Sequence, residues 1–441
     1  MLLKVRKSKT HGSVVIPGSK SHTIRALFIA SLAGGRSVIK DPLVSKDAYS
    51  AVSVCRAFGA RFENAGSSYI VEGFGGIPSV PENIVDVGNS GTTLRFAMMT
   101  AGLTDGCTVF TGDYQIRRRP LGSLIHAMNE LGAEVFSTRG NDMAPVVVKG
   151  MLKGGKAELD AVTSQYLSSV LINAPVIERD TEITITRLNE APYAEMTLWW
   201  LDNQGIRYEN DNFRKILIKG GQKYKAFDMR IPGDFSSATF FMVLAAVSGG
   251  EFLLKNLDMT DPQGDKKVLD YLQEMGADVR HTEEGIIIKG SKLKGIEIDL
   301  NSTPDALPAM AVAGCFAEGE TRLVNVPQAR MKETDRISVM CTELRKMGAD
   351  IKELEDGLVI RHSKLKGCRV SGHDDHRIVM ALAVAGLNIR GETVIETAEA
   401  VNVTFPQFPE IIRECGGDIQ LVTEVTDKKT YKVEQEPENR E

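Results

Sequence analysis

The sequence predicts an α/β (α+β) fold of two lobes, each built from three βαβαββ units around buried helices. The first observation is a short phrase ending in glycine that recurs after an amphipathic stretch, where glycine is the expected residue just past a helix end. These glycines lie 68 to 73 residues apart, at positions 59, 132, 205, 276, 348 and 416. A strand, a polar turn and usually a second strand follow each one, as in ADVRHTEEGIIIKG at 277–290. Six such units account for nearly all of the 441 residues.

The second observation is a set of helices that are apolar on nearly every side, rich in alanine and glycine, and in phase with the first phrase. Helices of this kind are typical of buried, closely packed positions. They are expected within residues 26–35, 96–106, 168–180, 240–250, 308–319 and 379–391. Chance recurrence in a glycine-rich chain is the alternative, but two phrases in phase over six copies argue against it. An open solenoid fits less well because its repeats usually span about 20 to 50 residues.

The two ends of the chain indicate how the lobes connect. The sixth unit has one strand after its glycine, at 418–422, whereas the chain begins with an unpaired strand at 12–17. We therefore expect the N-terminal strand to complete the C-terminal lobe. The chain would then cross between the lobes twice, near 18–20 and near 228–233.

These crossings divide the chain into two lobes and a tail. One predicted lobe is 20–229, and the other is 1–19 together with 230–421. The tail at 422–441 is charged and lacks apolar periodicity, so we expect it to be frayed.

Composition excludes several functional classes. The chain has 53 Lys and Arg against 58 Asp and Glu, a net charge of −5, so no basic excess points to nucleic acid or an anionic membrane. The six cysteines form no CxxC pair, which gives no sign of a disulfide framework or a zinc site. No uncharged run reaches the ~18 residues of a membrane span, and the N-terminus has no apolar signal core. We therefore expect a cytoplasmic chain without nucleic acid or membrane partners. Separately, we expect it to be a monomer.

A polar loop precedes each buried helix, and these loops carry the candidate site. They lie at 17–25, 86–95, 161–167, 232–240, 301–308 and 372–377. N-capping explains some of their polar residues, and we expect it for Asp234 and Ser236. It does not explain the cations in these loops, because a cation opposes the dipole at a helix N-terminus. These cations are Lys20, Arg25, Arg95 and Arg377. They indicate that the helix N-termini bind a multiply charged anion in a cleft between the lobes.

Two further segments add charge to the predicted site. Three arginines precede a proline at 117–120, where a solvated surface run is the alternative for Arg117 and Arg118. In the segment 329–337, three charged residues fall within about one helical turn, and an exposed helix with ion pairs is the alternative. These three are Lys332, Glu333 and Arg336.

The segment GHDDHR at 372–377 suggests a metal site, because His and Asp are suitable metal ligands. Adjacent residues rarely converge on one ion, however, and the arginine that follows would repel it. The chain also lacks the GxxxxGK[ST], GxGxxG, GxSxG and HExxH motifs, so nucleotide hydrolysis and nicotinamide chemistry are not supported. We expect no metal and no cofactor.

Taken in order, the motifs resemble those of the 5-enolpyruvylshikimate-3-phosphate (EPSP) synthase family. They are PGSKSHTIR, GNSGTTLR, RRRP, TSQ, PGDFSSA, TPDA, MKETDR and DDHR, and the resemblance runs from about residue 12 to 420. It implies transfer of the enolpyruvyl group of phosphoenolpyruvate to the 5-hydroxyl of shikimate 3-phosphate, through a tetrahedral intermediate and with release of phosphate. It also implies two lobes of three βαβαββ units each, an inside-out α/β barrel, and no cofactor.

The resemblance also implies roles for individual residues. Asp305 is the base at the reacting hydroxyl, Glu333 is the acid, and Lys20 is an alternative acid. The residues implied for shikimate 3-phosphate are Lys20, Ser21, Arg25, Thr163, Ser164, Gln165, Tyr193, Asp305 and Lys332. Those implied for phosphoenolpyruvate are Lys20, Asn89, Gly91, Thr92, Arg119, Gln165, Glu333, Arg336, His376 and Arg377. The 20–229 lobe is thereby expected to hold mainly shikimate 3-phosphate and the other lobe mainly phosphoenolpyruvate.

Three positions depart from the family pattern. Val403 stands where many members have a lysine that touches phosphoenolpyruvate. Glu190 stands in the slot of a serine that contacts the shikimate phosphate, and a carboxylate there would repel that phosphate. Gln115 stands where some members have arginine.

Two other functions are alternatives to this one. A UDP-N-acetylglucosamine enolpyruvyl transferase normally has a GAKNA-like first loop and a cysteine within 113–121, and this chain has neither. A catalytically silent anion-binding protein on the same scaffold is disfavoured because Asp305, Glu333 and Lys20 are all present. The loss of the usual lysine at Val403 is the one feature that favours it.

Overall fold

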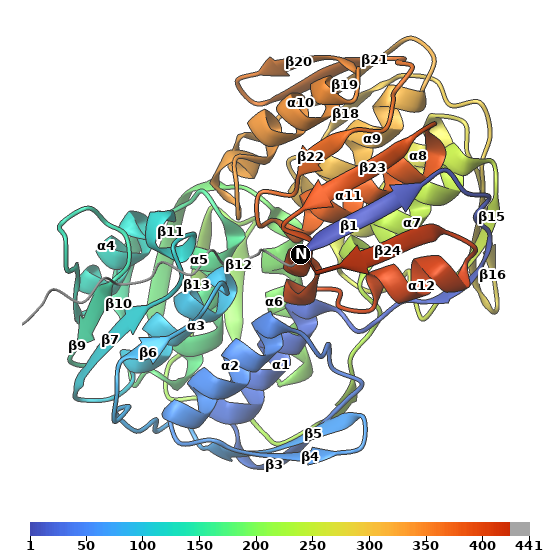
Figure 1. Cartoon of the computed structure of the whole chain (residues 1–441). Coiled ribbons are helices and arrows are strands. Elements are labelled where there is room, and N and C mark those ends of the chain that lie inside the picture. The colour runs from blue at the N-terminus through green and yellow to red at the C-terminus, as the bar shows by residue number, and fades with distance from the viewer. Residues whose placement is uncertain (424–441) are drawn as a thin grey trace, which may run out of the picture.

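The computed structural model describes residues 1–423, which form two lobes (Figure 1). Together the two lobes contain six four-stranded sheets and the helices packed on them. In Figure 1, the blue-to-green segments make one lobe, and the yellow-to-red segments together with the first strand make the other. This is the α/β architecture that the repeats predict. The predicted frayed tail lies outside the described residues from position 424 onward.

The third unit shows how each sheet is assembled. Its first two strands are parallel with a helix between them, and a second helix leads into an antiparallel hairpin, so that the sheet order is β10-β11-β13-β12. The predicted βαβαββ unit is therefore correct. Its elements are β10 (Gly155–Ala161), α5 (Ser164–Asn173), β11 (Thr181–Leu188), α6 (Ala191–Asn203), β12 (Tyr208–Asp211) and β13 (Lys215–Ile218).

The other elements repeat this plan. In the first lobe they are α1 (Lys20–Leu32), β3 (Gly34–Lys40), α2 (Lys46–Ala57), β4 (Arg61–Ala65), β5 (Ser68–Phe74), β6 (Val85–Asp86), α3 (Gly91–Ala101), β7 (Cys107–Thr111), η1 (Ile116–Arg118), α4 (Gly122–Glu130), β8 (Glu134–Ser137), β9 (Val146–Lys149), η2 (Ala174–Val176) and β14 (Asp228–Arg230).

In the second lobe the elements are β1 (Leu2–Arg6), β2 (Gly12–Val15), α7 (Phe235–Ser248), β15 (Glu251–Lys255), η3 (Gly264–Lys267), α8 (Val268–Glu274), β16 (Asp278–Thr282), β17 (Gly285–Lys289), β18 (Glu297–Asp299), η4 (Pro304–Ala306), α9 (Leu307–Phe316), β19 (Glu320–Val324), η5 (Pro327–Met331), α10 (Arg336–Lys346), β20 (Asp350–Leu354), β21 (Gly357–Arg361), β22 (Arg369–Ser371), α11 (His376–Asn388), β23 (Glu392–Glu396), η6 (Ala398–Val403), α12 (Phe408–Glu414) and β24 (Asp418–Val422).

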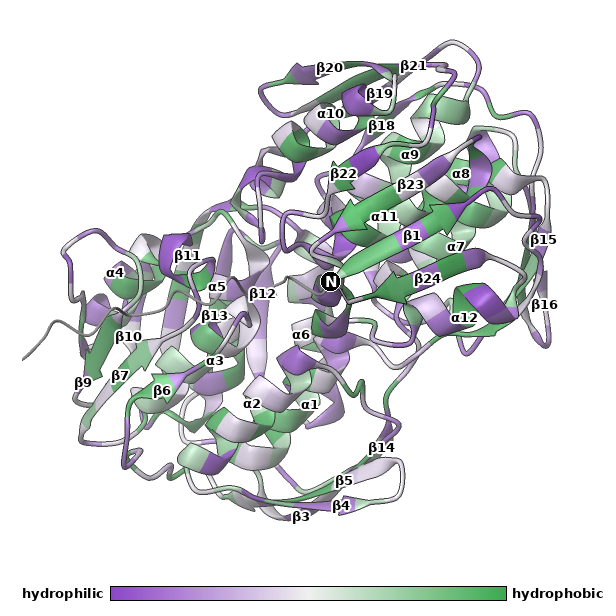
Figure 2. Ribbon diagram, in the orientation of Figure 1, coloured by the Kyte–Doolittle hydropathy of each residue, from purple (hydrophilic) through white to green (hydrophobic). Residues whose placement is uncertain are grey.

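Each lobe has its own apolar core, built around three central helices. Helices α1, α3 and α5 pack together in one core, and α7, α9 and α11 pack together in the other. In α11 every residue from His376 to Leu387 is buried. Figure 2 shows hydrophobic residues along α9 and α11 and hydrophilic ones in the connecting loops. One core draws on residues between 24 and 231, and the other on 3–16 and 235–419. The bounds of the predicted lobes, 20–229 and 1–19 with 230–421, stay a prediction.

The N-terminal segment contributes two strands to the second lobe, where the sequence predicted one. The sixth sheet is completed by β1 at residues 2–6, which lies between β23 and β24 and is antiparallel to both. The strand expected at 12–17 is β2, which is shorter and pairs in parallel with β15 of the fourth sheet. Strand β1 was not predicted because basic residues around Leu3 and Val5 obscure its short alternation of buried and exposed side chains. The strands that pair with it are also far away in the sequence.

The two crossings between the lobes lie side by side. Gly18 and Gly233 form an antiparallel bridge. The backbone N–H of Ser19 donates to the carbonyl of Pro232 at 2.8 Å, and that of Asp234 donates to Pro17 at 2.9 Å. The lobes are thus joined by a short two-stranded connection.

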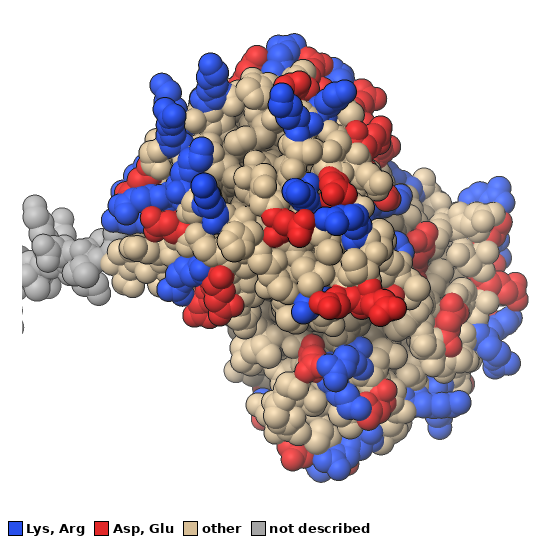
Figure 3. Space-filling model, turned by 90° about the vertical axis from the view of Figure 1, so that its right-hand side faces the viewer, with Lys and Arg blue, Asp and Glu red and all other residues tan. Residues whose placement is uncertain are grey.

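Charges of both signs are mixed on the molecular surface. On the face shown in Figure 3, acidic and basic side chains lie among one another and do not form one large patch of a single sign. Within residues 1–423, none of the helices combines the length and the apolar character that crossing a membrane requires.

Replacing Leu3 by Ala tests the central position of β1. Leu3 is fully buried and is paired in register with Ile395 and Leu421. Its truncation is expected to lower the free energy of unfolding by about 2–5 kcal/mol, measured by chemical denaturation. Leu421→Ala on the edge strand is the control, because Leu421 is 43% exposed, and it should cost less than about 1 kcal/mol. Equal losses in the two variants would contradict the central position of β1.

Candidate active site

The inner helices begin inside the predicted polar loops, so that several candidate residues lie in first turns. Helices α1, α3, α5 and α11 start at Lys20, Gly91, Ser164 and His376 and are capped by the side chains of Ser19, Ser90, Thr163 and Asp375. Asp234 caps α7, as predicted. Ser236 is not a cap, because its hydroxyl instead donates to the carboxylate of Asp265.

Most of the predicted substrate residues line connected cavities between the lobes. One cavity is lined by Lys20, Ser21, Arg25, Thr92, Ser164, Gln165, Glu190, Tyr193, Asp305 and Lys332. A neighbouring cavity of about 460 Å³ has Arg119, Lys332 and Glu333 in its wall. A third has Arg95, Thr163, Gln165, Glu190 and Lys332. Lys332 faces all three, so residues from both lobes share one polar cleft.

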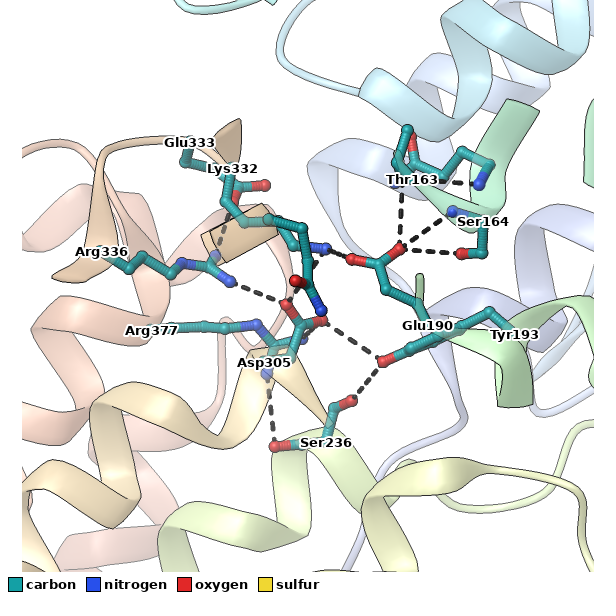
Figure 4. A network of polar contacts seen from close by, with 12 residues as sticks. Thr163, Ser164, Glu190, Tyr193, Ser236, Asp305, Lys332, Glu333, Arg336 and Arg377 are labelled. Atoms are coloured by element: carbon teal, nitrogen blue, oxygen red, sulfur yellow. Dashed lines mark hydrogen bonds and ion pairs between the residues drawn. The ribbon is translucent and has the colours of Figure 1, made fainter. Parts of the chain in front are cut away.

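A buried network of ion pairs forms the floor of the cleft (Figure 4). Arg336, only 1% exposed, donates to Asp305 at 2.8 Å, to Glu333 at 2.5 Å, and twice to Asp375 at 2.7 and 3.1 Å. Arg377 pairs with the other oxygen of Asp305 at 3.0 Å. Sequence reasoning noticed Asp375 only as a possible metal ligand, whereas here it holds Arg336 in place.

The same network sets the protonation of both predicted catalytic carboxyls. Burial alone would raise the pKa of Asp305, but Arg377, Lys332 and Arg336 together hold it well below its ordinary value. Burial would likewise raise the pKa of Glu333, and Arg119 and Arg336 outweigh it, so that this pKa is also well below the usual range. Both groups are therefore carboxylates at neutral pH.

The loop at 86–95, which the family resemblance assigns to phosphoenolpyruvate, is held by close polar contacts. The amide of Asn89 donates to Asp113 at 2.6 Å and to Gln115, and Gly91 lies beneath two guanidinium groups. A Cβ at Gly91 would come within 2.5 Å of the Nη1 atoms of both Arg95 and Arg119. A side chain at position 91 would therefore have to displace both guanidinium groups from their present positions.

The structure gives different outcomes for the two charged segments at 117–120 and 329–337. Arg117 and Arg118 are exposed, so the surface reading holds for both, although Arg118 also lines the 460 Å³ cavity. Arg119 is 7% exposed and pairs with Glu333 of the other lobe at 3.0 Å. The exposed-helix reading of 329–337 is wrong, since α10 begins only at Arg336 and the Glu333–Arg336 pair is buried.

Arg25 is fully engaged by protein groups. Its guanidinium donates to Thr197, to Ser168 and to the backbone oxygens of Ser21 and Tyr193. Burial lowers its pKa to about 9. In this arrangement Arg25 ties α1 to α5 and α6.

Acidic partners that the sequence did not reveal surround the remaining site residues. The hydroxyl of Tyr193 donates to Asp265 at 2.8 Å and to Asp305 at 3.4 Å, and burial followed by the charge of Asp305 raises the pKa of Asp265 to about 6. Lys20 lies 3.4 Å from Asp47. Asp265 and Asp47 stand in segments without any motif, so no sequence signal could have found them.

The histidines of GHDDHR do not converge on one point. His373 contacts Glu343 at 2.8 Å, whereas the imidazole of His376 is buried beside Glu333, and its burial lowers its pKa well below the usual value. Among residues 1–423, no three His, Cys, Asp or Glu side chains are grouped so as to hold a metal ion. Val403, at the end of η6, is 7% exposed and contributes to none of the three cavities described above.

Comparison with known proteins agrees with this geometry. The family model described as EPSP synthase (3-phosphoshikimate 1-carboxyvinyltransferase) matches residues 5–412. The 3-phosphoshikimate 1-carboxyvinyltransferase of Acetivibrio thermocellus is 68% identical over 419 residues, covering 95% of this chain and 99% of that protein. The protein of the same name from Ruminiclostridium cellulolyticum is 64% identical over 422 residues, covering 96% and 100%.

A solved structure leads to the same family. The EPSP synthase of Acinetobacter baumannii superposes with a TM-score of 0.80 at 28% sequence identity, covering 96% of this chain and 100% of that one. Six sheets, a cleft lined from both lobes and full-length matches of this identity leave one conclusion. The chain belongs to the EPSP synthase family, the 3-phosphoshikimate 1-carboxyvinyltransferases of the shikimate pathway.

Proposed function

We propose that the cleft transfers the enolpyruvyl group of phosphoenolpyruvate to the 5-hydroxyl of shikimate 3-phosphate, with Asp305 as the base. As a family member the chain is a transferase of aromatic amino acid biosynthesis. The observation that carries the assignment of roles is the cavity that gathers Lys20, Ser164, Asp305 and Lys332 from both lobes. The monomeric state stays a prediction. The cytoplasmic location stays a prediction.

The substrates explain why the cleft is rich in cations. Together they carry two phosphates and two carboxylates, which arginine binds in a bidentate manner and helix N-termini bind through free N–H groups. The N-terminus of α5 and Lys332 suit shikimate 3-phosphate. Arg119, Arg336 and Arg377 suit phosphoenolpyruvate.

Substrate binding prepares Asp305 for its role as a base. The guanidinium groups of Arg336 and Arg377 now hold the pKa of Asp305 so low that it is a weak base. Phosphoenolpyruvate bound to the same arginines would offset their charge, which raises the pKa of Asp305 toward the range in which it can accept a proton. The base thus gains strength when the second substrate is in place.

The reaction then proceeds by addition and elimination. The 5-oxygen of shikimate 3-phosphate attacks the central carbon of phosphoenolpyruvate as its proton passes to Asp305. The methylene carbon receives a proton from Lys20, or from Glu333 once phosphoenolpyruvate bound to Arg119 and Arg336 has offset their charge, raised the pKa of Glu333 and allowed it to take up a proton. In the second step a methyl proton returns to the group that donated it, the electrons of that C–H bond form the new C=C bond, and the bond from the central carbon to the phosphate oxygen breaks, so that phosphate leaves with that electron pair. Closure of the lobes excludes water from this intermediate.

Phosphate release tests both the activity and the identity of the acid. The wild-type chain should release phosphate from phosphoenolpyruvate with shikimate 3-phosphate and not with UDP-N-acetylglucosamine. If Glu333 is the acid, Glu333→Gln lowers kcat by about 10²–10⁴-fold while Lys20→Met mainly raises KM. The reverse split assigns the acid to Lys20. A folded wild-type chain that binds both substrates without releasing phosphate would be the silent binding protein instead.

A further inference from the structure

Glu190 occupies an anion site inside the cleft. It immediately precedes α6, is 1% exposed, and has a left-handed backbone with φ of 61°. One carboxylate oxygen accepts from the backbone N–H of Ser164 at 3.2 Å, from its hydroxyl at 2.9 Å and from the hydroxyl of Thr163 at 3.2 Å. The other oxygen accepts from Lys332 of the second lobe. Figure 4 shows this carboxylate between the start of α5 and Lys332.

These contacts are the ones a phosphate would use. A helix N-terminus with two hydroxyl donors and a facing lysine binds phosphate oxygens through free N–H groups and opposite charge. Thr163 and Ser164 are also the residues that the family resemblance assigns to shikimate 3-phosphate. The protein carboxylate and the substrate phosphate therefore compete for one set of donors.

We propose that Glu190 is a tethered anion that shikimate 3-phosphate must displace, and that it thereby sets the affinity for the phosphorylated substrate. This proposal rests on the proposed function, because it takes the start of α5 as the site of the substrate phosphate. The tethered carboxylate also draws Lys332 across the cleft, so that displacement frees this lysine for the incoming phosphate.

A second cation is available to the displaced carboxylate. Arg95 is 3% exposed, lines the same cavity as Glu190, and interacts with it electrostatically. Two of its nitrogens donate to backbone oxygens of Gly91 and Pro120, but its Nε has no hydrogen-bond partner within the described residues. The side chain of Glu190 can therefore turn from Lys332 toward a buried cation rather than be left without a counter-charge.

Calorimetric titration of binding to Glu190→Gln and Glu190→Ser tests the proposal. Gln keeps the shape without the charge, and Ser removes the competitor altogether. Shikimate 3-phosphate should bind about 3- to 30-fold more tightly to both variants, because the fraction of sites open to phosphate rises. Inorganic phosphate should gain in the same direction, whereas shikimate without its phosphate should change little. Glu195→Gln is the matched control, since Glu195 is an exposed carboxylate on the same helix.

Each outcome has one meaning. Tighter binding of shikimate 3-phosphate and inorganic phosphate in either folded variant supports the tethered anion. Unchanged or weaker binding in both variants overturns it and makes Glu190 a positioning residue for Ser164 and Lys332. The proposed function is tested separately by phosphate release from the wild type, and the inorganic phosphate titration reads the site even where that release is not seen.

Discussion

Asp305→Asn is expected to lower kcat by about 10²–10⁴-fold without raising the KM for phosphoenolpyruvate. Asparagine keeps the size of the side chain but cannot accept the proton of the 5-hydroxyl. The substitution also removes the carboxylate that now neutralises Arg336 and Arg377, so these arginines are left more positive toward an anionic substrate. Steady-state phosphate release with both substrates varied separates the two effects.

The control for this variant is Asp270→Asn, which removes an exposed carboxylate on α8 outside the cleft. It should retain wild-type kcat. Circular dichroism of both variants checks that the fold is intact. A folded Asp305→Asn chain with a kcat within a few-fold of wild type would exclude Asp305 as the base.

Asp375→Asn is expected to lower both stability and activity. Asp375 is fully buried, accepts two hydrogen bonds from Arg336 and caps α11 through the backbone N–H of Arg377 at 2.9 Å. Without this charge a buried guanidinium loses its principal partner, at a cost of about 3–5 kcal/mol. A guanidinium displaced by about 1 Å also costs about 10²-fold in kcat/KM for phosphoenolpyruvate. Denaturation and steady-state kinetics measure the two losses.

The comparison variant is Asp350→Asn on β20. Its side chain is 65% exposed and lies 3.6 Å from Arg361, so the loss should be within about 1 kcal/mol. Equal stability of the Asp350 and Asp375 variants would mean that Asp375 is dispensable for holding Arg336.

The fold could be predicted because its signals are local and repeated. Glycines beyond helix ends and apolar inner helices recur six times, and each repeat can be recognised without its neighbours. Strand β1 could not be found in this way, because Leu3 pairs with Ile395 and Leu421 at the far end of the chain. Pairing across such a separation leaves no trace in the local pattern.

Local sequence patterns predicted the cationic side of the site, whereas on the acidic side Asp305 and Glu333 were named only through the family resemblance, and Asp47 and Asp265 were not found. Cations at helix N-termini contradict the helix dipole and so demand an anion, which identified Lys20 and Arg377. A carboxylate in the same loops suits the dipole and is taken for a cap or a surface group. Glu190 and Lys332 are 142 residues apart, and only the folded chain brings them together.

The position of β1 also determines when the second lobe can complete its folding during translation. Strand β1 leaves the ribosome long before its partners β23 and β24, which lie almost 400 residues further along the chain. At about 5–20 residues per second, the N-terminal segment waits roughly 20 to 80 seconds for these partners. Meanwhile the core of residues 24–231 has its full set of strands and helices. The lobe of residues 20–229 can therefore form during translation, whereas the other lobe, and with it the complete cleft, can form only once β23 and β24 have been made.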